Sequence, residues 1–207
     1  MKRFLLLPIF LNPLTETVQA VNWYGTPAGN YQASAEIFGM DGRLLWAREE
    51  RIALGPDETV SCFPADYPED RPEVCFVRLR LSDERGALVS GNLYWRGKEE
   101  GNYRALKDVA PATLAGSVRQ TGSDGEIRLA LRLENTGETP AMMLRVKVTD
   151  SSTGDLIVPV LYSDNYFFLM PGESREVAIR LQKEDVAGLP KVSVSGFNVE
   201  EREFSKK

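Results

Sequence analysis

Apolar and polar side chains alternate with period two along most of this chain, and this alternation constrains the fold more than any other feature. A clear case ends at the turn-forming residues 40–42 and carries the apolar side chains Tyr31, Ala33, Ala35 and Ile37. Residues two apart on a strand point to the same face of a sheet, so the pattern predicts strands with one buried face. Helical spacing is confined to the short segment 183–187. We therefore expect an almost entirely β fold.

Turn signals divide the alternating pattern into short strands of similar spacing. In the first half we expect strands at 4–11, 17–20, 31–37, 44–50, 58–63, 74–82 and 87–95. In the second half we expect them at 113–120, 127–134, 142–149, 164–169, 174–181 and 192–199. Many short strands with regular turns are typical of antiparallel sandwiches.

The stretch 97–111, with Gly101 and Pro111, separates the two groups of strands and has little apolar periodicity. A chain of 207 residues is long enough for two domains of about 100 residues, each with its own core. We therefore predict an all-β protein of two tandem immunoglobulin-like antiparallel β-sandwich domains, residues 1–98 and 99–207. Three turn features recur at a similar offset and favour two copies of one unit: Asn22 with Asn135, Asp41-Gly42 with Gly154-Asp155, and Gly55-Pro56 with Pro171-Gly172.

Composition excludes several classes of function. The net charge of -5 and the lack of a Lys/Arg stripe argue against nucleic acid as a partner. The absence of histidine removes the usual neutral-pH base and the commonest metal ligand. Cys62 and Cys75 lack zinc-ligand spacing, and we interpret them as core residues, with a disulfide between them as the alternative. The acidic residues Asp150, Asp155 and Asp164 are too widely spaced for a calcium loop, so we expect no metal and no cofactor.

The N-terminus combines Lys2 and Arg3 with the apolar run 4–11, which resembles a signal peptide. Pro8 interrupts the run and no small-x-small cleavage site follows closely, so we interpret it as a strand that leads into the Asn12-Pro13 turn. No run approaches the roughly 20 apolar residues of a membrane span, so we expect no membrane partner. The cellular location is left open.

Acidic residues occur as neighbours at 49–50, 99–100 and 200–201. Neighbours on a strand point to opposite faces and cannot present two carboxylates to one bond, so we assign no catalytic residue. Aromatic residues are better candidates, because sugar-binding surfaces stack rings on exposed Trp or Tyr while nearby Asp and Asn bind hydroxyls. The candidates for carbohydrate contact are Trp23, in a Gly/Pro-rich loop, and the cluster Tyr162, Asp164, Asn165 and Tyr166.

The alternative for the 162–166 cluster is structural: its aromatic side chains are core, and Asp164 and Asn165 satisfy backbone groups in a turn. If the segment is extended, Tyr162, Asp164 and Tyr166 share one face. Trp23 is open to a similar alternative, in which it pins its own loop.

Three sequence motifs, which we call the three phrases, are more specific for a protein family than the alternation is: GNLYWRG at 91–97, PVLYSDNYFFLMPGES at 159–174 and VSVSGFNV at 192–199. Together they resemble the C-terminal immunoglobulin-like sandwiches of family 2 glycoside hydrolases of the exo-β-glucosaminidase and β-mannosidase type, from about Leu11 to Val199. The resemblance implies a parent enzyme whose two catalytic glutamates lie on a preceding (β/α)₈ barrel, often periplasmic or secreted. A barrel needs roughly 250 residues of alternating strand and helix, for which this chain has no room.

The leading hypothesis is a non-catalytic accessory region with a structural and interdomain role, whose partners are the barrel and other domains of the parent glycosidase. On this hypothesis the chain alone is not an enzyme. The main alternative is an autonomous carbohydrate-binding module that uses Trp23 or the 162–166 cluster. A generic adhesion scaffold is a third option, which the specific phrases disfavour. The sequence leaves the sugar and linkage of the parent enzyme undetermined.

Overall fold

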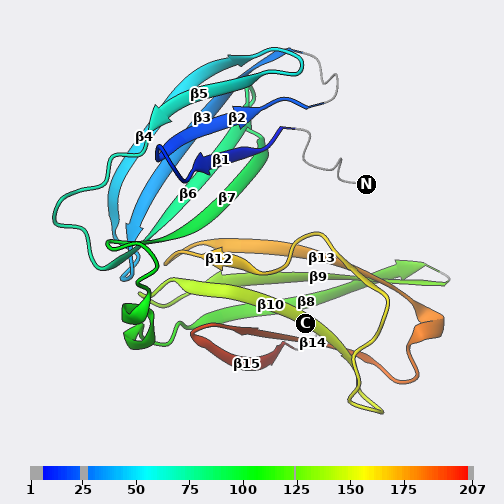
Figure 1. The fold of residues 1–207 in the computed structure, drawn as a ribbon. Helices are drawn as coiled ribbons and strands as arrows, with labels where there is room; N and C mark the ends of the chain where they lie inside the picture. The colour runs from blue at the N-terminus through cyan, green and yellow to red at the C-terminus, as the bar shows by residue number, and fades with distance from the viewer. Residues whose placement is uncertain (1–6, 24–27, 124, 205–207) are drawn as a thin grey trace. The chain divides into compact units, whose positions relative to one another are not determined.

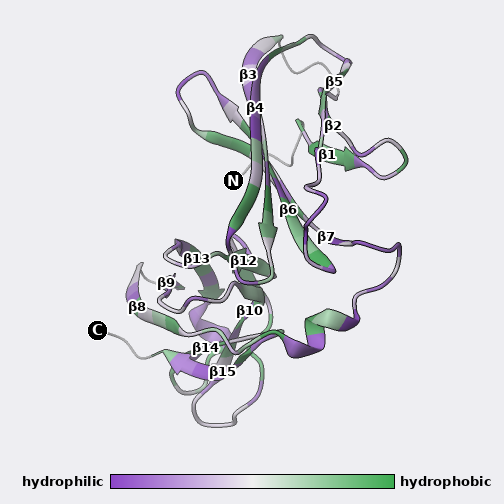
Figure 2. Cartoon of the chain, turned by 90° about the vertical axis from the view of Figure 1, so that its left-hand side faces the viewer, coloured by the Kyte–Doolittle hydropathy of each residue, from purple (hydrophilic) through white to green (hydrophobic). Residues whose placement is uncertain are grey.

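The computed structural model describes residues 7–23, 28–123 and 125–204, and in this part of the chain two short 3₁₀ helices accompany fifteen strands (Figure 1). The chain divides into two compact units, Met1–Asp108 and Val109–Lys207. Each unit is built from two antiparallel sheets, which confirms the predicted fold class of tandem immunoglobulin-like sandwiches. Hydrophobic and hydrophilic stretches both occur along the strands of each unit, as expected for sheets with one face on a core (Figure 2).

The first unit sets a sheet of three strands against a sheet of four. The smaller sheet has the order β1 (Ile9–Asn12), β2 (Thr17–Val21), β5 (Thr59–Pro64). The larger has the order β4 (Leu44–Leu54), β3 (Gly29–Gly39), β6 (Val74–Asp83), β7 (Leu88–Gly97). Ala33, Ala35 and Ile37 are fully buried, so the predicted alternation is confirmed. The predicted strand 4–11 lies partly outside the described residues, and β1 is the part that is described.

The second unit sets two sheets of four strands against each other. One has the order β11 (Val160–Tyr162), β13 (Ser174–Gln182), β9 (Glu126–Asn135), β8 (Leu114–Ser123). The other has the order β12 (Phe167–Leu169), β10 (Ala141–Asp150), β14 (Pro190–Gly196), β15 (Val199–Phe204). The two short helices are η1 (Arg104–Asp108), inside the predicted connection 97–111, and η2 (Lys183–Asp185), in the predicted helix-like segment.

Two predicted strands of the second unit were wrong in extent. The strand expected at 164–169 begins only at Phe167, because β11 belongs to one sheet, β12 to the other, and residues 163–166 cross between them. The strand expected at 192–199 ends at Gly196, and β15 follows as a separate strand. Asn198 holds the turn between them: its side chain accepts from Met142 N at 3.0 Å and donates to Pro140 O at 2.9 Å.

Both cysteines are free thiols, so the disulfide alternative is excluded. Cys75 is buried in the core of the first unit, and Cys62 is partly buried against it. Burial, assisted by the charge of Glu50, raises the pKa of Cys62 to about 11. Cys62 is therefore protonated at neutral pH and behaves as a small core residue, as predicted.

The recurring asparagines Asn22 and Asn135 occupy equivalent positions in the two sandwiches. Asn22 follows β2 and Asn135 ends β9, and both are fully buried. Asn22 N donates to Glu58 O at 2.8 Å, and Asn135 N donates to Glu173 O at 2.9 Å. Each asparagine thereby joins the end of one strand to the turn before a neighbouring strand, β5 or β13.

The turns themselves, 55–58 and 170–173, are closed in the same way. The Glu58 carboxylate accepts from Gly55 N at 2.6 Å, and the Glu173 carboxylate accepts from Met170 N at 3.0 Å. This geometry matches Pro56 with Pro171, so the predicted match of Gly55-Pro56 with Pro171-Gly172 was wrong by one residue. The third position of each turn has a left-handed backbone, with φ of 51° at Asp57 and 77° at Gly172.

We predict that Gly172→Ala destabilises the second unit by about 1 kcal/mol, because a Cβ is unfavourable in the left-handed region. A Cβ built at Gly172 meets no atom within 4 Å, so the loss reflects backbone conformation alone. Gly172→Asn is the matched variant and should lose less, since Asn tolerates this region. Urea denaturation measures both, and equal stability of Gly172→Ala and the unaltered chain would contradict the explanation.

Candidate functional site

The predicted sugar-contact cluster at 162–166 lies on the crossing between β11 and β12. Tyr162 is half-buried and packs against the core of the second unit. The Asp164 carboxylate accepts from Arg175 Nη1 at 2.6 Å and from the backbone N–H of Asn165 at 2.9 Å. Arg175 also lies over the ring of Phe167, 4.7 Å from its centroid. Asp164 therefore orders the crossing.

Asn165 replaces part of a strand ladder with its side chain. Its Oδ1 accepts from Val146 N at 2.8 Å, and its Nδ2 donates to Val146 O at 3.1 Å. The backbone N–H and C=O of Val146 would otherwise lack a strand partner on the side of β10 that faces β12, because β12 begins only at Phe167, two residues after Asn165. Asn165 thus attaches the crossing to β10.

Tyr166 is the last residue of the crossing. Its backbone is left-handed, with φ 57°, and the residue is 55% exposed. The segment is therefore not extended, so the condition under which Tyr162, Asp164 and Tyr166 would share one face is not met. Tyr162 packs inward and Tyr166 points to solvent, because the left-handed residue breaks the alternation. Asp164 and Asn165 both bind other groups of the same unit.

Trp23 lies on the first unit and is 53% exposed. It borders residues 24–27 of the Gly/Pro-rich loop, which lie outside the described residues. Of the five predicted contact residues, four belong to the second unit and Trp23 belongs to the first.

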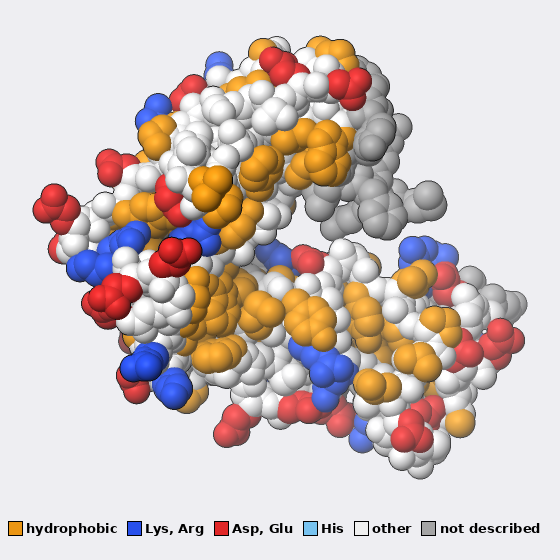
Figure 3. Space-filling model, in the orientation of Figure 1, with side chains coloured by type: hydrophobic (Ala, Val, Ile, Leu, Met, Phe, Trp, Pro, Cys, Tyr) orange, Lys and Arg blue, Asp and Glu red, His pale blue; other side chains and the backbone are white. Residues whose placement is uncertain are grey.

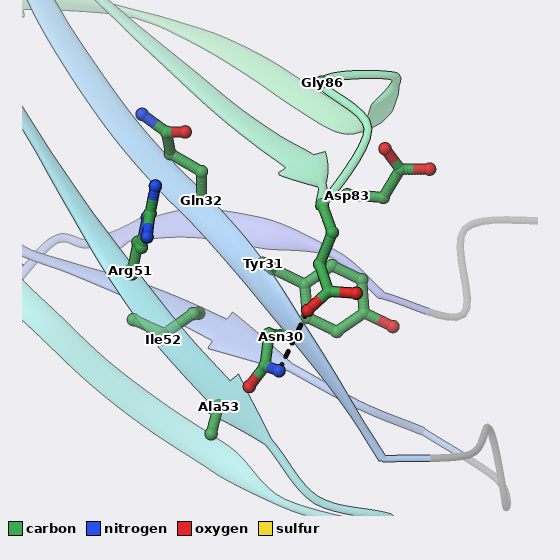
Figure 4. Close-up of a pocket in the computed structure, with 9 residues that line it drawn as sticks. Asn30, Tyr31, Gln32, Arg51, Ile52, Ala53, Asp83 and Gly86 are labelled. Atoms are coloured by element: carbon green, nitrogen blue, oxygen red, sulfur yellow. Dashed lines mark hydrogen bonds between the residues drawn. The ribbon is translucent and has the colours of Figure 1, made fainter.

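A hollow of about 580 Å³ lies on the first unit, beside strands β3 and β4 and the turn after β6 (Figure 4). Asn30 Nδ2 donates to Glu84 Oε1 at 3.0 Å across it, and Gln32 Nε2 donates to Glu49 Oε2 at 2.6 Å. Tyr31 lines the hollow but packs partly against the core. The hollow thus offers polar groups without a freely exposed ring. Sequence reasoning missed it because its residues come from three separate segments.

Asp150 has the most extensively bonded carboxylate among these candidates. It lies at the end of β10, is buried, and accepts from the backbone N–H groups of Ser152, Ala187 and Gly188 at 2.8, 2.8 and 2.9 Å. The hydroxyl of Ser152 donates to the same carboxylate. These bonds, led by that of Gly188, hold the pKa of Asp150 well below its usual range. The arrangement joins β10 to the loop before β14 and serves the fold.

The described residues contain no group of three or more His, Cys, Asp or Glu side chains that could hold a metal ion. Nor does any helix in the described ranges have the length and apolarity needed to cross a membrane.

The fold and the candidate residues define a protein of tandem immunoglobulin-like sandwiches, in which Asp164, Asn165 and Asp150 bind backbone or side-chain groups of their own unit. Residues 92–199, more than half of the chain, match the family model described as the exo-β-D-glucosaminidase Ig-fold domain. The chain belongs to this family. The resemblance drawn from the three sequence phrases is thereby confirmed.

Several curated relatives match most of the chain but are far longer. An exo-β-D-glucosaminidase of Hypocrea jecorina is 32% identical over 194 residues, which is 83% of this chain and 21% of that protein. An exo-β-D-glucosaminidase of Streptomyces avermitilis is 30% identical over 217 residues, 94% of this chain and 22% of that protein. An exo-β-D-glucosaminidase of Arthroderma benhamiae is 24% identical over 90% of this chain and 23% of that protein. The chain spans about a fifth of the length of these relatives.

Solved structures share the fold. The exo-chitosanase of Amycolatopsis orientalis matches with a TM-score of 0.87 at 20% identity, over 96% of this chain and 26% of that one. The β-D-mannosidase of Dictyoglomus thermophilum matches with a TM-score of 0.62 at 14% identity, over 96% of this chain and 22% of that one.

We predict that Asn165→Ala destabilises the second unit by roughly 1–3 kcal/mol, because both backbone groups of Val146 lose their partner. Asp164→Ala should lose only about 0–1 kcal/mol, since its ion pair with Arg175 is partly exposed. Urea denaturation compares the two variants. A larger loss for Asp164→Ala would show that Asp164, and not Asn165, holds the crossing.

We predict an acid-sensitive second unit, because Asp150 has a lowered pKa in the folded state. Its stabilising contribution is complete above about pH 5, beyond the unfolded carboxyl pKa of about 4, and is lost as the pH falls toward the lower folded value. Urea midpoints between pH 2 and 7 measure this dependence. Asp150→Asn should lower the midpoint at neutral pH and flatten its acid dependence, and Ser152→Ala should have a smaller effect. An unchanged acid dependence in Asp150→Asn would contradict the assignment.

Proposed function

We propose that this chain is the non-catalytic accessory region of an exo-β-glucosaminidase-like or β-mannosidase-like glycoside hydrolase, with a structural and interdomain role beside a catalytic barrel. The observation that carries the proposal is the pattern of coverage. Three relatives named exo-β-D-glucosaminidase match 83–94% of this chain, yet the chain spans only 21–23% of them. Both units are sandwiches, the architecture of the matched family model.

The positions of the acidic pairs support a role without catalysis by this chain alone. Glu49 accepts from Gln32, whereas Glu50 pairs with Arg48 at 3.2 Å. Glu201 pairs with Lys147 at 2.7 Å, and this contact lowers the pKa of Glu201. These three carboxylates bind different neighbours, whereas glycoside hydrolysis needs two carboxyl groups that flank one bond.

The carbohydrate-binding alternative has less support. Asp164 and Asn165, the groups proposed to take sugar hydroxyls, are bound to Arg175 and Val146. Tyr166 alone presents an exposed ring from that cluster. Binding modules generally combine a stacking ring with hydrogen-bonding groups that are available to the ligand.

We predict that the chain alone gives no turnover above buffer with aryl β-glycosides of glucosamine, mannose or galactose. We also predict that it can replace the matching stretch of the Streptomyces avermitilis exo-β-D-glucosaminidase. That chimera should retain glucosaminidase activity, whereas deletion of the stretch should shorten the half-life of activity at least tenfold on heating.

The control is a chimera in which an unrelated tandem sandwich of similar length replaces the stretch. It should behave like the deletion, because the required surfaces are absent. Turnover by the isolated chain that is lost on changing one carboxylate would overturn the accessory role. Equal half-lives for the deletion and the parent enzyme would overturn the structural role.

A further inference from the structure

Large apolar side chains gather at one end of the outer face of the sheet β12-β10-β14-β15. Leu144 pairs with Phe167 in antiparallel register, so Tyr166 lies beside Arg145 of β10, and Phe197 N donates to Met142 O at 2.8 Å on the other side. Tyr166, Met143 and Phe197 are 55%, 39% and 52% exposed. Figure 3 shows hydrophobic side chains at the surface of the second unit over β10 and β12, interrupted by Lys and Arg. We call Met143, Arg145, Tyr166 and Phe197 the β10 patch.

Two residues of the β10 patch adopt an unfavourable backbone conformation. Met143 has φ 51°, at the irregular register between Ala141 and Leu144, and Tyr166 has φ 57°. Residues other than glycine are rarely found there, and such outliers persist only where the surrounding structure holds them. Asn165 supplies this hold for Tyr166 through its bonds to Val146 and to Tyr166 N. The fold thus tolerates strain at two neighbouring positions that present large side chains to solvent.

The residue types of the β10 patch suit a protein partner better than a sugar. Met, Tyr, Phe and Arg are enriched at the centres of protein interfaces, where Lys, Glu and Asp are depleted. A sugar site would need hydrogen-bonding groups beside the ring, and Asp164 and Asn165 are bound within the unit. Exposed large apolar side chains on one sheet face, as at Met143, Tyr166 and Phe197, are a feature of protein interaction surfaces.

The lengths of the relatives indicate which protein supplies that partner. Relatives that match nearly all of this chain have only 21–23% of their length in the match, so more than three quarters of each polypeptide lies elsewhere. We propose that the β10 patch docks against that remaining part of an exo-β-glucosaminidase-type glycosidase, on a surface with an apolar centre and a carboxylate that meets Arg145. This inference rests on the proposed function and names the surface through which it acts.

Hydroxyl-radical footprinting tests the proposal, because Met143 and Tyr166 both react readily when exposed. The isolated chain is compared with the chimera in which it replaces the matching stretch of the Streptomyces avermitilis enzyme. Oxidation of Met143 and Tyr166 should be at least fivefold slower in the chimera. Leu161, on the outer face of the other sheet of the same unit and also exposed, should react at the same rate in both.

A pair of matched variants separates docking from folding. Met143→Lys with Tyr166→Lys should shorten the half-life of chimera activity at least tenfold on heating. The control, Leu156→Lys with Leu161→Lys, changes two apolar residues that are also exposed, at 52% and 61%, and should leave the half-life within twofold. Both double variants of the isolated chain should keep the circular dichroism spectrum and thermal midpoint of the unaltered chain.

Each other outcome overturns the assignment. An active chimera whose β10 patch stays reactive shows that the surface is wrong, while the proposed function stands. An inactive chimera, together with no binding of the isolated chain to the deletion variant of the enzyme, counts against both. Protection of the patch in the isolated chain that grows with concentration assigns the surface to a second copy. Protection by added β-linked glucosamine oligosaccharide assigns it to carbohydrate.

Discussion

Burial of one face of each sheet against its partner is the interaction on which the rest of this structure depends. Leu131 and Leu133 on β9 oppose Val146 and Val148 on β10 in the second core, and all four are at most 2% exposed. Burying a side chain of this size contributes roughly 1.5–3 kcal/mol, so a few such rows account for much of the stability of a small domain. Because sheets in such sandwiches pack about 10 Å apart, side chains of the two inner faces fill the whole space between them. Functional groups are therefore confined to strand ends, edges and outer faces.

Strand ends create a second requirement, because backbone groups that leave a ladder still need partners. This protein meets it with Asn and Asp side chains. Asn135 donates to Thr139 O and Leu169 O, Asn165 binds both backbone groups of Val146, and Asp150 accepts from four donors. Asn and Asp side chains that resemble sugar-binding groups in the sequence are thereby used as hydrogen-bond partners within the fold. This use of the side chains supports the proposed accessory role over an autonomous binding module.

The outer face of the sheet around β10 divides into surfaces of different character. Lys147, Glu201 and Ser193 form a charged and polar network at its centre, typical of a face open to water. Met143 and Tyr166 lie toward the start of β10, with unfavourable backbone conformations and exposed apolar side chains. A module selected only for its own stability gains nothing from such a patch. The patch is accounted for if the module works as one part of a larger glycosidase, which is the form in which its relatives exist.

The sequence by itself determined the sandwich class, the positions of most strands and the family, because period-two burial and turn chemistry are local properties. Ala33, Ala35 and Ile37 were assigned to a buried face from spacing alone. Only the tertiary structure decided that 163–166 crosses between sheets, that β14 ends at Gly196, and that Tyr166 faces solvent. Each of these depends on a side chain that binds backbone far away in the sequence, Asn165 to Val146 and Asn198 to Pro140 and Met142. Alternation cannot reveal such bonds, because the geometry that permits them exists only once the two sheets have packed.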